Sequence, residues 1–511
     1  MKAAQTLLAL AEREGVRACF ANPGTSEMHL VAALDAAPSI RPVLCLFEGV
    51  ATGAADGYGR MMQAPALTLL HLGPGLGNGL ANLHNANRAR TSIVSLIGEH
   101  ATFHRANNPP LTSDIAALAG PVSAWVRTVE STADLLPLAQ EAFEAARRNG
   151  PSALILPADI AWSDDTLSLP PTRTPSDEDI DAGLIEEAAQ LLGPRTLLLL
   201  GGRFLSAETC SLAQRIGEKT GALVLIETFP ARVRREGSAA QLKRLPYLSE
   251  IAAAALAGID TIVLAGAAEP VAFFALPGRP TKLARDNARL FQLTPRGHSA
   301  ERVLEMLAAK LKAPYTSAPR TSAPSPPSSG GAIDAAALAQ CFAATLPADA
   351  IVCDESNTAG LFCYDAAAAG PPHDWLTLTG GSIGQGLPLA TGAAIACPDR
   401  RVIALEADGS ALYTIQALWT QAREGLSVTN IILNNGAYAI LRLEMMRAGI
   451  NQLSEAANAL FDLKRPSIDF CSIARGFGVP AERVETPAAL TAALQRNYRA
   501  SGPALIEVMI R

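Results

Sequence analysis

The sequence predicts an α/β protein built from three doubly wound parallel-sheet domains. Short apolar runs alternate with segments of helical period along the whole chain, and continuous apolar runs are typical of strands that are buried on both faces of a parallel sheet. The chain has 511 residues, which at roughly 150 residues per domain favours three domains. Two stretches rich in proline and polar residues, 162–181 and 313–332, are expected to be linkers.

These linkers divide the chain into segments 1–162, 181–312 and 333–511. In each segment, apolar runs of strand length are separated by stretches long enough for a helix, as in βαβ units. Strands are expected at 16–21, 42–47, 66–71, 93–97 and 153–156 in the first segment, at 196–200, 222–226 and 261–265 in the second, and at 350–353, 375–378, 402–405, 429–433 and 504–510 in the third.

The composition excludes several classes of protein. Charged residues make up 18% of the chain and the formal net charge is −6; no run of Lys or Arg stands out, so nucleic acid is not expected as a partner. The mean hydropathy of +0.19 indicates that much apolar surface is buried, in cores or in subunit contacts. The eight cysteines are scattered without a C-x-x-C pair, which argues against a zinc or redox motif and favours a reducing cytoplasm.

Neither a secretory signal nor a membrane span is expected. The apolar run within residues 1–15 is short and meets Glu12 and Arg13, so this stretch is predicted to form an amphipathic helix. The longest apolar stretch, 251–268, is interrupted by Asp260 and is not expected to cross a membrane.

Polar residues come directly after two strands of the third segment. Asp408 and Ser410 lie just beyond one expected strand, and Asn435 lies just beyond the next strand along the chain. Because the carboxyl ends of adjacent parallel strands meet at one edge of a sheet, these groups are expected to lie together. Ser410 opens a helix, whose free N–H groups suit phosphate. Carboxylate, amide and backbone carbonyl oxygens beside phosphate suit Mg²⁺.

The A-D-G-S…N-N pattern of residues 407–435 resembles the thiamine diphosphate motif, which reads G-D-G-S/A and then N-N. Residues 48–60 resemble the E-x-x-A-x-x-x-A-D-G-Y/F-A/G-R element of the acetolactate synthase and pyruvate decarboxylase superfamily. The loops N-P-G at 22–24, G-P-G-L-G-N at 73–78 and G-G-S-I-G-Q-G-L-P at 380–388 also match. Residues 22–27 (N-P-G-T-S-E), 70–72 (L-H-L) and 354–358 (D-E-S-N-T) resemble the N-P-G-S-N-E, L-H-S and N-E-S-T-S stretches of the benzoylformate decarboxylase branch.

The resemblance implies a pyrimidine-binding first domain, a Rossmann-like middle domain and a diphosphate- and Mg²⁺-binding third domain. Glu48 would hydrogen-bond N1′ of the aminopyrimidine, Ile383 would hold the cofactor bent, and the Gly381 carbonyl would accept from the 4′-amino group. The implied contacts to the diphosphate come from Asn357, Thr358, Gly409, Ser410 and Tyr413, and those to the metal from Asp408, Asn435 and the carbonyl of Ala437.

Groups for proton transfer and substrate binding are expected in the first segment. His71 aligns with a histidine that serves decarboxylases in proton transfer, and Thr25 aligns with a serine that contacts the substrate carboxylate, with Ser26 beside it. His100 and His104 come after the next strand and are further candidates for the same pocket. For a lone histidine at a strand end, a purely structural role is the alternative.

The sequence departs from the family pattern at several places. Ala407 stands where the metal motif has glycine. Apolar residues 270–274 stand where benzoylformate decarboxylase supplies a second histidine, and Leu443 and Glu444 stand where that branch is aromatic, so an aromatic 2-oxo acid is not favoured. The strand at 196–200 ends in G-G-R and not in G-x-G-x-x-G, so neither FAD nor NAD is expected in the middle domain.

These inferences predict a thiamine diphosphate- and Mg²⁺-dependent 2-oxo acid decarboxylase or carboligase, a lyase or transferase whose enamine intermediate yields an aldehyde or a 2-hydroxy ketone. Two alternatives stay open: an acetolactate synthase catalytic subunit with FAD and a regulatory subunit, and a non-catalytic thiamine diphosphate-binding paralogue. A nucleotide-dependent dehydrogenase lacks its fingerprint here. Because the superfamily builds its site between two chains, a cytoplasmic homodimer or homotetramer is expected, with a 2-oxo acid and, for ligation, an acceptor aldehyde as small-molecule partners.

Overall fold

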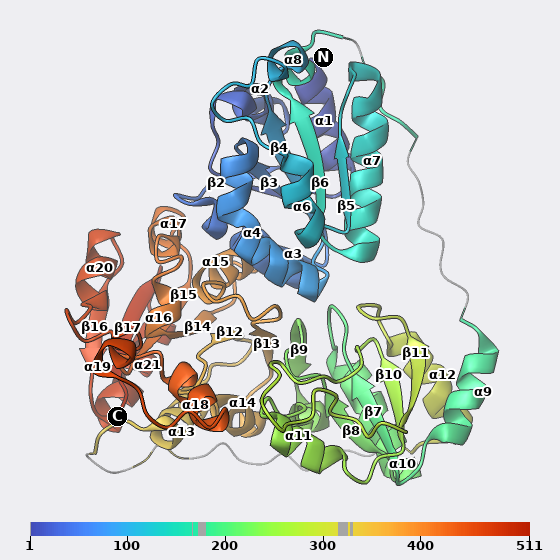
Figure 1. Ribbon diagram of the computed structural model, residues 1–511, viewed down its shortest axis with the longest axis vertical. Coiled ribbons are helices and arrows are strands. Elements are labelled where there is room, and N and C mark those ends of the chain that lie inside the picture. Colours follow the sequence, from blue (N-terminus) through green and yellow to red (C-terminus); the bar gives the residue numbers. More distant parts are fainter. Residues whose placement is uncertain (1, 166, 172–179, 315–324, 326, 328–330) are drawn as a thin grey trace.

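The computed structural model describes the whole chain except residues 1, 166, 172–179, 315–324, 326 and 328–330. It contains three α/β domains, each with a mainly parallel sheet (Figure 1). The first domain lies at the top of Figure 1, the middle domain at the lower right and the third at the lower left. The predicted fold class is confirmed. Both predicted linkers lie partly outside the described residues.

The first domain has a six-stranded parallel sheet in the order β2-β1-β3-β4-β6-β5. One group of helices, α1, α2, α7 and α8, packs on one face, while α3, α4 and α6 pack together on the other. The bounds are α1 (Ala3–Arg13), β1 (Ala18–Ala21), α2 (Met28–Ala33), β2 (Arg41–Leu44), α3 (Glu48–Met62), β3 (Ala66–Leu70), α4 (Leu72–Ala89), β4 (Ile93–Glu99), α5 (Thr102–Arg105), α6 (Ile115–Ala119), β5 (Trp125–Thr128), α7 (Thr132–Asn149), β6 (Ser152–Pro157) and α8 (Ala158–Trp162), with 3₁₀ turns η1 (Thr25–Glu27), η2 (Leu34–Ala36) and η3 (Gly120–Val122).

The middle domain has a four-stranded parallel sheet in the order β11-β10-β7-β8. Its strand order reverses beside β7, and ligands of such sheets bind at the carboxyl ends of the strands at that point. The bounds are α9 (Ala182–Leu191), β7 (Thr196–Leu200), α10 (Ala207–Thr220), β8 (Leu223–Ile226), β9 (Arg232–Arg235), η4 (Gly237–Gln241), α11 (Ser249–Leu256), β10 (Thr261–Ala265), β11 (Arg289–Thr294) and α12 (Glu301–Leu311).

The third domain has a seven-stranded sheet in the order β16-β17-β15-β14-β12-β13-β9. Its edge strand β9 comes from the middle segment of the chain and pairs antiparallel with β13. The bounds are α13 (Ala335–Thr345), β12 (Ile351–Glu355), α14 (Cys363–Ala366), η5 (Ala367–Ala369), β13 (His373–Thr377), α15 (Gly386–Ala396), β14 (Val402–Ala407), α16 (Asp408–Ala411), α17 (Ala417–Arg423), β15 (Val428–Asn434), α18 (Ala439–Arg447), α19 (Glu455–Ala459), α20 (Phe470–Gly476), β16 (Ala481–Val484), α21 (Pro487–Arg499) and β17 (Ala504–Met509).

Each strand expected from a continuous apolar run is present, whereas β5, β9, β11 and β16 were not predicted. All four lie at the edges of their sheets. Strands β5, β11 and β16 carry half-exposed and exposed residues, and β9 is largely buried but reads R-V-R-R, so none of the four has the apolar run that identifies a central parallel strand. Within the described residues, no helix has the length and apolar character needed to cross a membrane.

The first and third domains share one apolar core, because α3 crosses α15 in close contact. The approach depends on glycine: a Cβ on Gly57 would overlap the backbone of Leu389, and a Cβ on Gly392 would overlap the backbone of Ala54. The alanine- and glycine-rich sequence after Glu48 is therefore a packing surface for the third domain.

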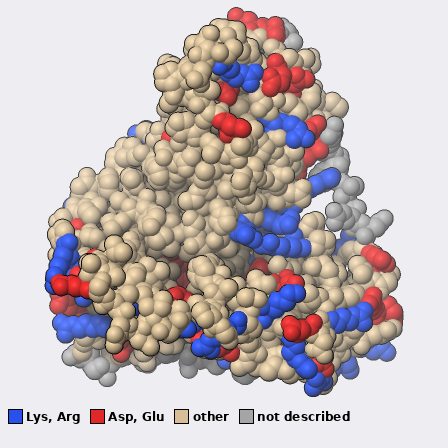
Figure 2. All heavy atoms as spheres, in the orientation of Figure 1, with Lys and Arg blue, Asp and Glu red and all other residues tan. Residues whose placement is uncertain are grey.

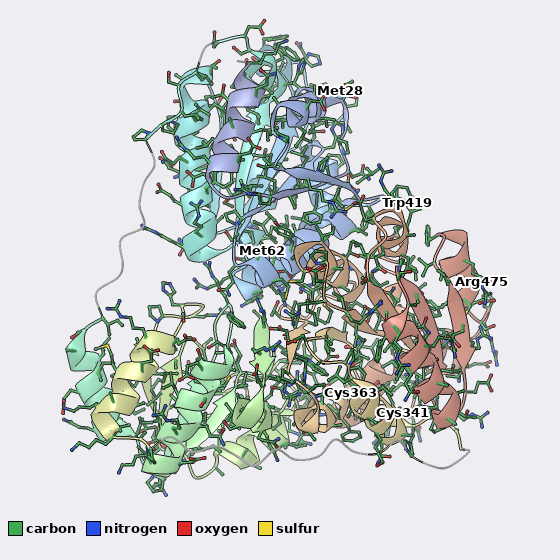
Figure 3. All side chains as sticks on the ribbon, turned by 180° about the vertical axis from the view of Figure 1, so that it is seen from behind. Met28, Met62, Cys341, Cys363, Trp419 and Arg475 are labelled. Carbon is green, nitrogen blue, oxygen red and sulfur yellow. The ribbon has the colours of Figure 1, made fainter. Side chains whose placement is uncertain are left out.

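A buried ion pair in α3 joins all three domains. The Arg60 guanidinium donates to both carboxylate oxygens of Asp56, at 2.9 and 2.6 Å. It also donates to the carbonyls of Ala231 in the middle domain and Thr377 in the third domain, at 3.1 and 2.8 Å. Figure 3 shows Met62, two residues further along α3, where the first domain meets the other two.

Replacing Arg60 by glutamine is expected to lower the free energy of unfolding by about 3–5 kcal/mol, because it leaves the buried Asp56 carboxylate without its positive partner. Denaturant unfolding followed by circular dichroism measures the change. The control is Arg105→Gln, because the Arg105–Glu130 pair is solvent-exposed, with side-chain exposures of 31% and 63%, and is expected to contribute less than about 1 kcal/mol. Equal effects of the two substitutions would contradict this role of Arg60.

Candidate active site

The end of β14 and the loop after β15 bring the predicted metal ligands together. Asp408 is the first residue of α16, and its Oδ2 accepts hydrogen bonds from the backbone N–H groups of Asn435 and Gly436, at 3.1 and 2.7 Å. Its Oδ1 accepts from the Gly409 N–H at 2.8 Å. Burial raises the pKa of the Asp408 carboxyl, and these backbone donors oppose that rise. The juxtaposition of Asp408 and Asn435 inferred from the strand ends is present.

The other residues predicted around the diphosphate lie at the same edge of the sheet. Asn357 comes after β12 with a φ of +50° and donates from Nδ2 to Ser410 Oγ at 3.1 Å. Ala437 accepts at its carbonyl from Ala439 N–H within the turn that precedes α18. Thr358 is half-buried and Tyr413 is exposed. Of these residues, Asn357 is brought to α16 by its hydrogen bond to Ser410.

The loop before α15 is held by a buried glutamate that sequence reasoning had not singled out. Glu355, the last residue of β12, accepts from the Gly384 and Gly386 N–H groups at 2.6 and 2.5 Å. Gly381 in this loop has a φ of +74°, and Ile383 is half-buried. Glu355 thus fixes the segment that carries both predicted contacts to the aminopyrimidine side of the cofactor.

Burial also controls the charge beneath this loop. Desolvation raises the pKa of the Glu355 carboxyl to about 7, although backbone N–H donors oppose the rise. Glu406 lies next to it, with both carboxyl oxygens buried and without a hydrogen-bond partner among the described residues. Burial and the neighbouring Glu355 raise the pKa of Glu406 well above its usual range.

Glu48 is the first residue of α3, where the positive end of the helix dipole favours a carboxylate. Its Oε2 accepts from Asn78 Nδ2 at 3.0 Å, and its Oε1 faces Gly75 in α4. The side chain is half-exposed in the single chain, and Phe47 beside it is half-buried. The apolar enclosure predicted for Glu48 is therefore only partly supplied by its own chain.

Ser26, Glu27 and His71 form a hydrogen-bonded cluster in the first domain. His71 Nδ1 lies 2.9 Å from Glu27 Oε2 and 3.0 Å from Ser26 Oγ, and Ser26 Oγ donates to Glu27 Oε1 at 2.6 Å. Glu27 is fully buried, while the His71 side chain is 24% exposed. A histidine that donates from Nδ1 to a carboxylate keeps Nε2 available for a second partner.

Glycine at position 24 makes this cluster possible. A Cβ there would overlap the His71 ring, and the Gly24 N–H donates to Glu27 Oε2 at 2.8 Å. Glu27 ends the N-P-G-T-S-E sequence of residues 22–27, but its role could not be assigned without the position of His71.

Thr25, His100 and His104 are not hydrogen-bonded to this cluster in the described structure. Thr25 is exposed at the start of η1. The His100 and His104 rings pack edge to face with centroids 5.7 Å apart, and His104 Nδ1 contacts Asn107 at 3.2 Å. His100 Nε2 is buried without a hydrogen-bond partner among the described residues. The structure supports mutual packing of the two histidines and leaves their proposed place in the pocket as a prediction.

Helix α4 connects the two groups of site residues. Asn78 binds Glu48, whereas Asn82 Nδ2 donates both to the Gly49 carbonyl at 2.8 Å and to the Gly384 carbonyl at 3.1 Å. Asn85 Nδ2 donates to the Ser382 carbonyl at 2.7 Å. The spacing of these asparagines, at i, i+4 and i+7, puts them on one face of the helix. This spacing is the feature of the sequence from which a polar face of α4 could have been predicted.

Comparisons with known proteins agree with this geometry. The family model for the thiamine pyrophosphate enzyme N-terminal TPP binding domain matches residues 1–117, and that for the C-terminal TPP binding domain matches residues 359–508. A Mycobacterium tuberculosis protein with the provisional name acetolactate synthase large subunit IlvX is 48% identical over 517 aligned residues, which cover 100% of this chain and 99% of the relative.

The chain belongs to the thiamine pyrophosphate enzyme family. Benzoylformate decarboxylase of Pseudomonas aeruginosa is 29% identical to it, with 97% of this chain and 96% of the relative covered. The solved structure of the Rhodococcus jostii RHA1 thiamine diphosphate-dependent 4-hydroxybenzoylformate decarboxylase superposes with a TM-score of 0.84 at 26% identity, covering 100% and 99% of the two chains. This thiamine pyrophosphate enzyme is therefore of the acetolactate synthase and benzoylformate decarboxylase type, as its motifs predicted.

The residues of the third domain fit the family's cofactor. Asp408 and Asn435 offer hard oxygens at the end of a parallel sheet, the donor type that Mg²⁺ prefers. A Cβ on Gly409 would overlap the Tyr438 ring, so glycine is required in this turn. The substitution of Ala407 for the motif's glycine leaves the chelating carboxylate in place.

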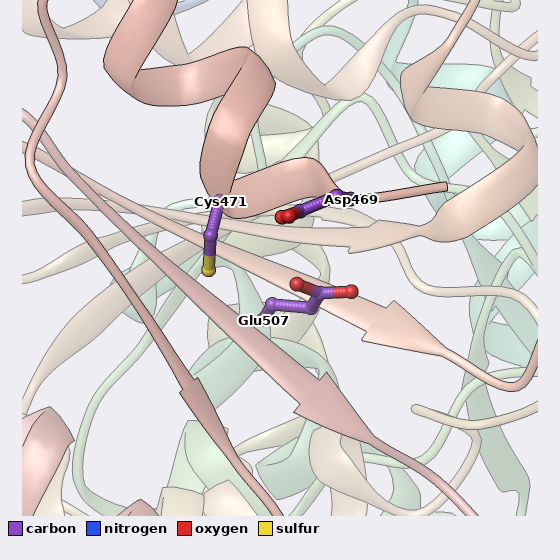
Figure 4. Close-up of side chains that lie close together, drawn as sticks. All are labelled: Asp469, Cys471 and Glu507. Atoms are coloured by element: carbon purple, nitrogen blue, oxygen red, sulfur yellow. The ribbon is translucent and has the colours of Figure 1, made fainter. Parts of the chain in front are cut away.

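A second cluster of possible metal-ligating groups, Asp469, Cys471 and Glu507, has a structural explanation (Figure 4). Asp469 caps α20 by accepting from the Ser472 N–H at 2.9 Å. Glu507 accepts from Arg483 and from Asn434, at 3.0 and 2.8 Å. Burial raises the pKa of the Cys471 thiol to about 11, so it stays protonated at neutral pH. Through its bond to Asn434, Glu507 holds the first residue of the turn at 434–436.

Replacing Glu355 by glutamine is expected to weaken thiamine diphosphate binding by roughly tenfold or more. This is the usual effect of removing a residue that orients the groups in contact with a ligand. The glutamine NH₂ would face the Gly384 or Gly386 N–H, which is also a donor, and the loop would lose its anchor. Fluorescence titration with thiamine diphosphate and Mg²⁺ measures the affinity. Glu301→Gln is the matched control, because Glu301 also accepts hydrogen bonds but lies in the middle domain; an equally large effect there would contradict the assignment.

Proposed function

We propose that this thiamine pyrophosphate enzyme is a Mg²⁺-dependent 2-oxo acid decarboxylase or carboligase. The observation that carries the proposal is that one chain holds two half-sites: Glu48 and the Ser26–Glu27–His71 cluster in the first domain, and Asp408 with Asn435 in the third. Thiamine diphosphate, when bound, supplies a carbon nucleophile for the 2-oxo carbonyl and accepts the electrons left when CO₂ departs.

The residues of the chain then act on protons and on binding. Asp408, Asn435 and the Ala437 carbonyl would hold Mg²⁺, while Asn357, Ser410 and the N–H groups at the start of α16 would bind the diphosphate. Glu48 would hold a proton at N1′ of the aminopyrimidine. His71 would give a proton to, or take one from, the substrate at Nε2, with its ring oriented by the hydrogen bond between Nδ1 and Glu27.

We propose that the complete site lies between two chains of a cytoplasmic homodimer or homotetramer. The half-exposed Glu48 supports this assembly, because a partner chain would complete its enclosure. All eight cysteines are unpaired and all but Cys397 are buried, which agrees with a reducing compartment.

A second candidate, an acetolactate synthase catalytic subunit, is favoured by the 48% identity to the Mycobacterium tuberculosis relative. The two candidates differ in the step after CO₂ release: protonation gives an aldehyde, whereas attack on a second 2-oxo acid gives a 2-hydroxy-2-methyl-3-oxo acid from pyruvate. A CO₂-release assay with thiamine diphosphate and Mg²⁺ over a panel of 2-oxo acids, with and without acceptor aldehydes, tests both. Failure to release CO₂ or to ligate with any acid would favour a non-catalytic paralogue.

Glu48→Ala and Asp408→Ala are each expected to reduce turnover at least about a hundredfold, because one loses the proton-holding group and the other a metal ligand. Mixing the two inactive variants under conditions of subunit exchange is expected to restore up to about a quarter of wild-type activity. About half of the dimers are then mixed, and one of the two sites in each mixed dimer is intact. No recovery despite exchange, or an active monomer in sedimentation, would place the whole site within one chain.

His71→Gln is expected to lower kcat by roughly a hundredfold while thiamine diphosphate affinity is retained, because proton transfer and not cofactor binding is affected. Steady-state aldehyde release and cofactor titration measure the two effects. His29→Gln is the control, since His29 is an exposed histidine of the same domain. An unchanged kcat in His71→Gln would remove this residue from the mechanism.

A further inference from the structure

A segment of the third domain that has no role in the proposed reaction begins directly after the predicted metal ligands. Residues 438–461, which contain α18 and α19, leave the sheet after β15 and return to the same place. The Leu463 N–H donates to the Gly436 carbonyl at 2.9 Å, and Ala437 pairs with Asp462 in an antiparallel bridge. The base of this α18–α19 segment is therefore attached to the turn that holds the predicted metal ligands.

Apolar packing does not fix the α18–α19 segment within the single chain. Every residue of α18 and α19 is described, and none of them is buried. Leu441, Met446 and Leu460 are exposed, and Figure 2 shows mostly uncharged side chains on the surface around α18. A helix without a buried side chain gains little from the hydrophobic effect. The position of α18 against the rest of the chain therefore depends on polar contacts.

Arg447 joins α18 to α11 of the middle domain. Its Nε and Nη2 donate to the two carboxylate oxygens of Glu250, at 3.1 and 2.6 Å. Its Nη1 donates to both carboxylate oxygens of Glu444, at 2.7 Å each, and Nη2 also donates to Ser249 Oγ at 3.2 Å. The Arg447 side chain is only 11% exposed. Paired bonds between a guanidinium and a carboxylate fix the orientation of the two groups as well as their distance.

Three groups of this contact keep one ionisation state around neutral pH. Hydrogen bonds from Arg447 lower the pKa of Glu250 to about 2, and the hydrogen bonds with Glu250 raise the pKa of Arg447. Burial and Glu444 raise the pKa of Tyr247 to about 12, so its hydroxyl stays protonated and can donate. Two carboxylates thus flank one guanidinium, and they would repel each other without it.

Tyr247 connects Glu444 to the loop before α15. Its hydroxyl donates to Glu444 Oε1 at 3.2 Å, and its ring packs against the Phe273 ring with centroids 5.7 Å apart. Phe273 in turn lies against Gly381, because a Cβ added to this glycine would come within 2.3 Å of Phe273 Cζ. The middle domain therefore contacts the candidate site at two places, at α18 and at the loop that carries Gly381.

We propose that Arg447 is a positioning residue, which holds α18 against the middle domain and thereby fixes the turn that carries Asn435 and Ala437. Glu444 joins the two connections, because it accepts from Arg447 on one side and from Tyr247 on the other. The expected effects on Mg²⁺ and on the 2-oxo acid rest on the proposed function, whereas the effect on the motion of α18 does not.

Hydrogen exchange followed by mass spectrometry tests the contact in the full chain, saturated with thiamine diphosphate and Mg²⁺. Arg447→Met keeps a long side chain but leaves the Glu250 and Glu444 carboxylates to repel each other. Amide exchange in residues 438–461 is expected to become at least about tenfold faster, with exchange in α13 and α21 unchanged. Arg447→Lys is expected to give an intermediate rate, because it keeps the charge and loses the paired bonds. Equal exchange of α18 in the wild type and in Arg447→Met overturns the proposal.

The affinities for the metal and the substrate test the consequence for the site. Arg447→Met is expected to weaken Mg²⁺ binding in the presence of thiamine diphosphate by roughly tenfold, the usual effect of removing a residue that orients metal ligands. The KM for the 2-oxo acid is expected to rise by a larger factor than kcat falls, and Arg447→Lys is expected to restore part of both affinities. A merely destabilised fold would not produce this division between KM and kcat.

Arg496→Met is the matched control, because Arg496 is also an arginine of the third domain that forms an ion pair, with Glu482, away from the candidate site. Near-ultraviolet circular dichroism shows whether each variant is folded. If exchange in α18 rises while Mg²⁺ affinity and KM stay at the values of Arg496→Met, Arg447 does not position the site and the proposal is wrong. A wild type that turns over no 2-oxo acid would contradict the proposed function instead, and exchange and Mg²⁺ affinity would then decide the role of Arg447.

Discussion

The buried Asp56–Arg60 pair is the interaction on which the arrangement of the three domains depends. A buried guanidinium is tolerated only when its N–H donors are hydrogen-bonded. Asp56 accepts some of the Arg60 hydrogen bonds, and carbonyls of the other two domains accept the others. Gln385 and Thr91 add hydrogen bonds to the same carboxylate. The three domains must therefore be docked for this centre to be satisfied, and α3 is fixed relative to both neighbours.

The docking of α3 also positions Glu48, the carboxylate proposed to act on the cofactor. Glu48 stands about two helical turns before Asp56 in the same helix, so the pair that orients α3 also orients the carboxylate. Helix α4 adds a second connection. Its Asn78 donates to Glu48, and its Asn82 donates to the Gly384 carbonyl in the loop before α15. The candidate residues of both half-sites in one chain are thus held by two adjacent helices of the first domain.

Much of this arrangement could be predicted from the sequence, and the limits have physical causes. Glu48, Asp408 and Asn435 come after buried strands or open helices, so local pattern places them at sheet edges. Glu27 contacts His71 and Glu355 contacts Gly384, both distant in the sequence. Local sequence patterns do not predict such contacts. The four strands that were not predicted lack a continuous apolar run: β5, β11 and β16 have half-exposed or exposed residues, and β9 consists largely of arginine.

The strand β9 has a consequence for how the chain can be divided. Although it belongs to the middle segment in sequence, it covers the backbone of β13 in the third domain. A fragment cut at the linker near residue 333 would keep the binding motifs of the third domain but would expose a bare row of peptide N–H and C=O groups along β13. Such an edge invites pairing with other chains. The linker near residue 333 is therefore a poor place to cut the chain. A third domain that stays soluble on its own is expected to need strand β9 from the middle segment.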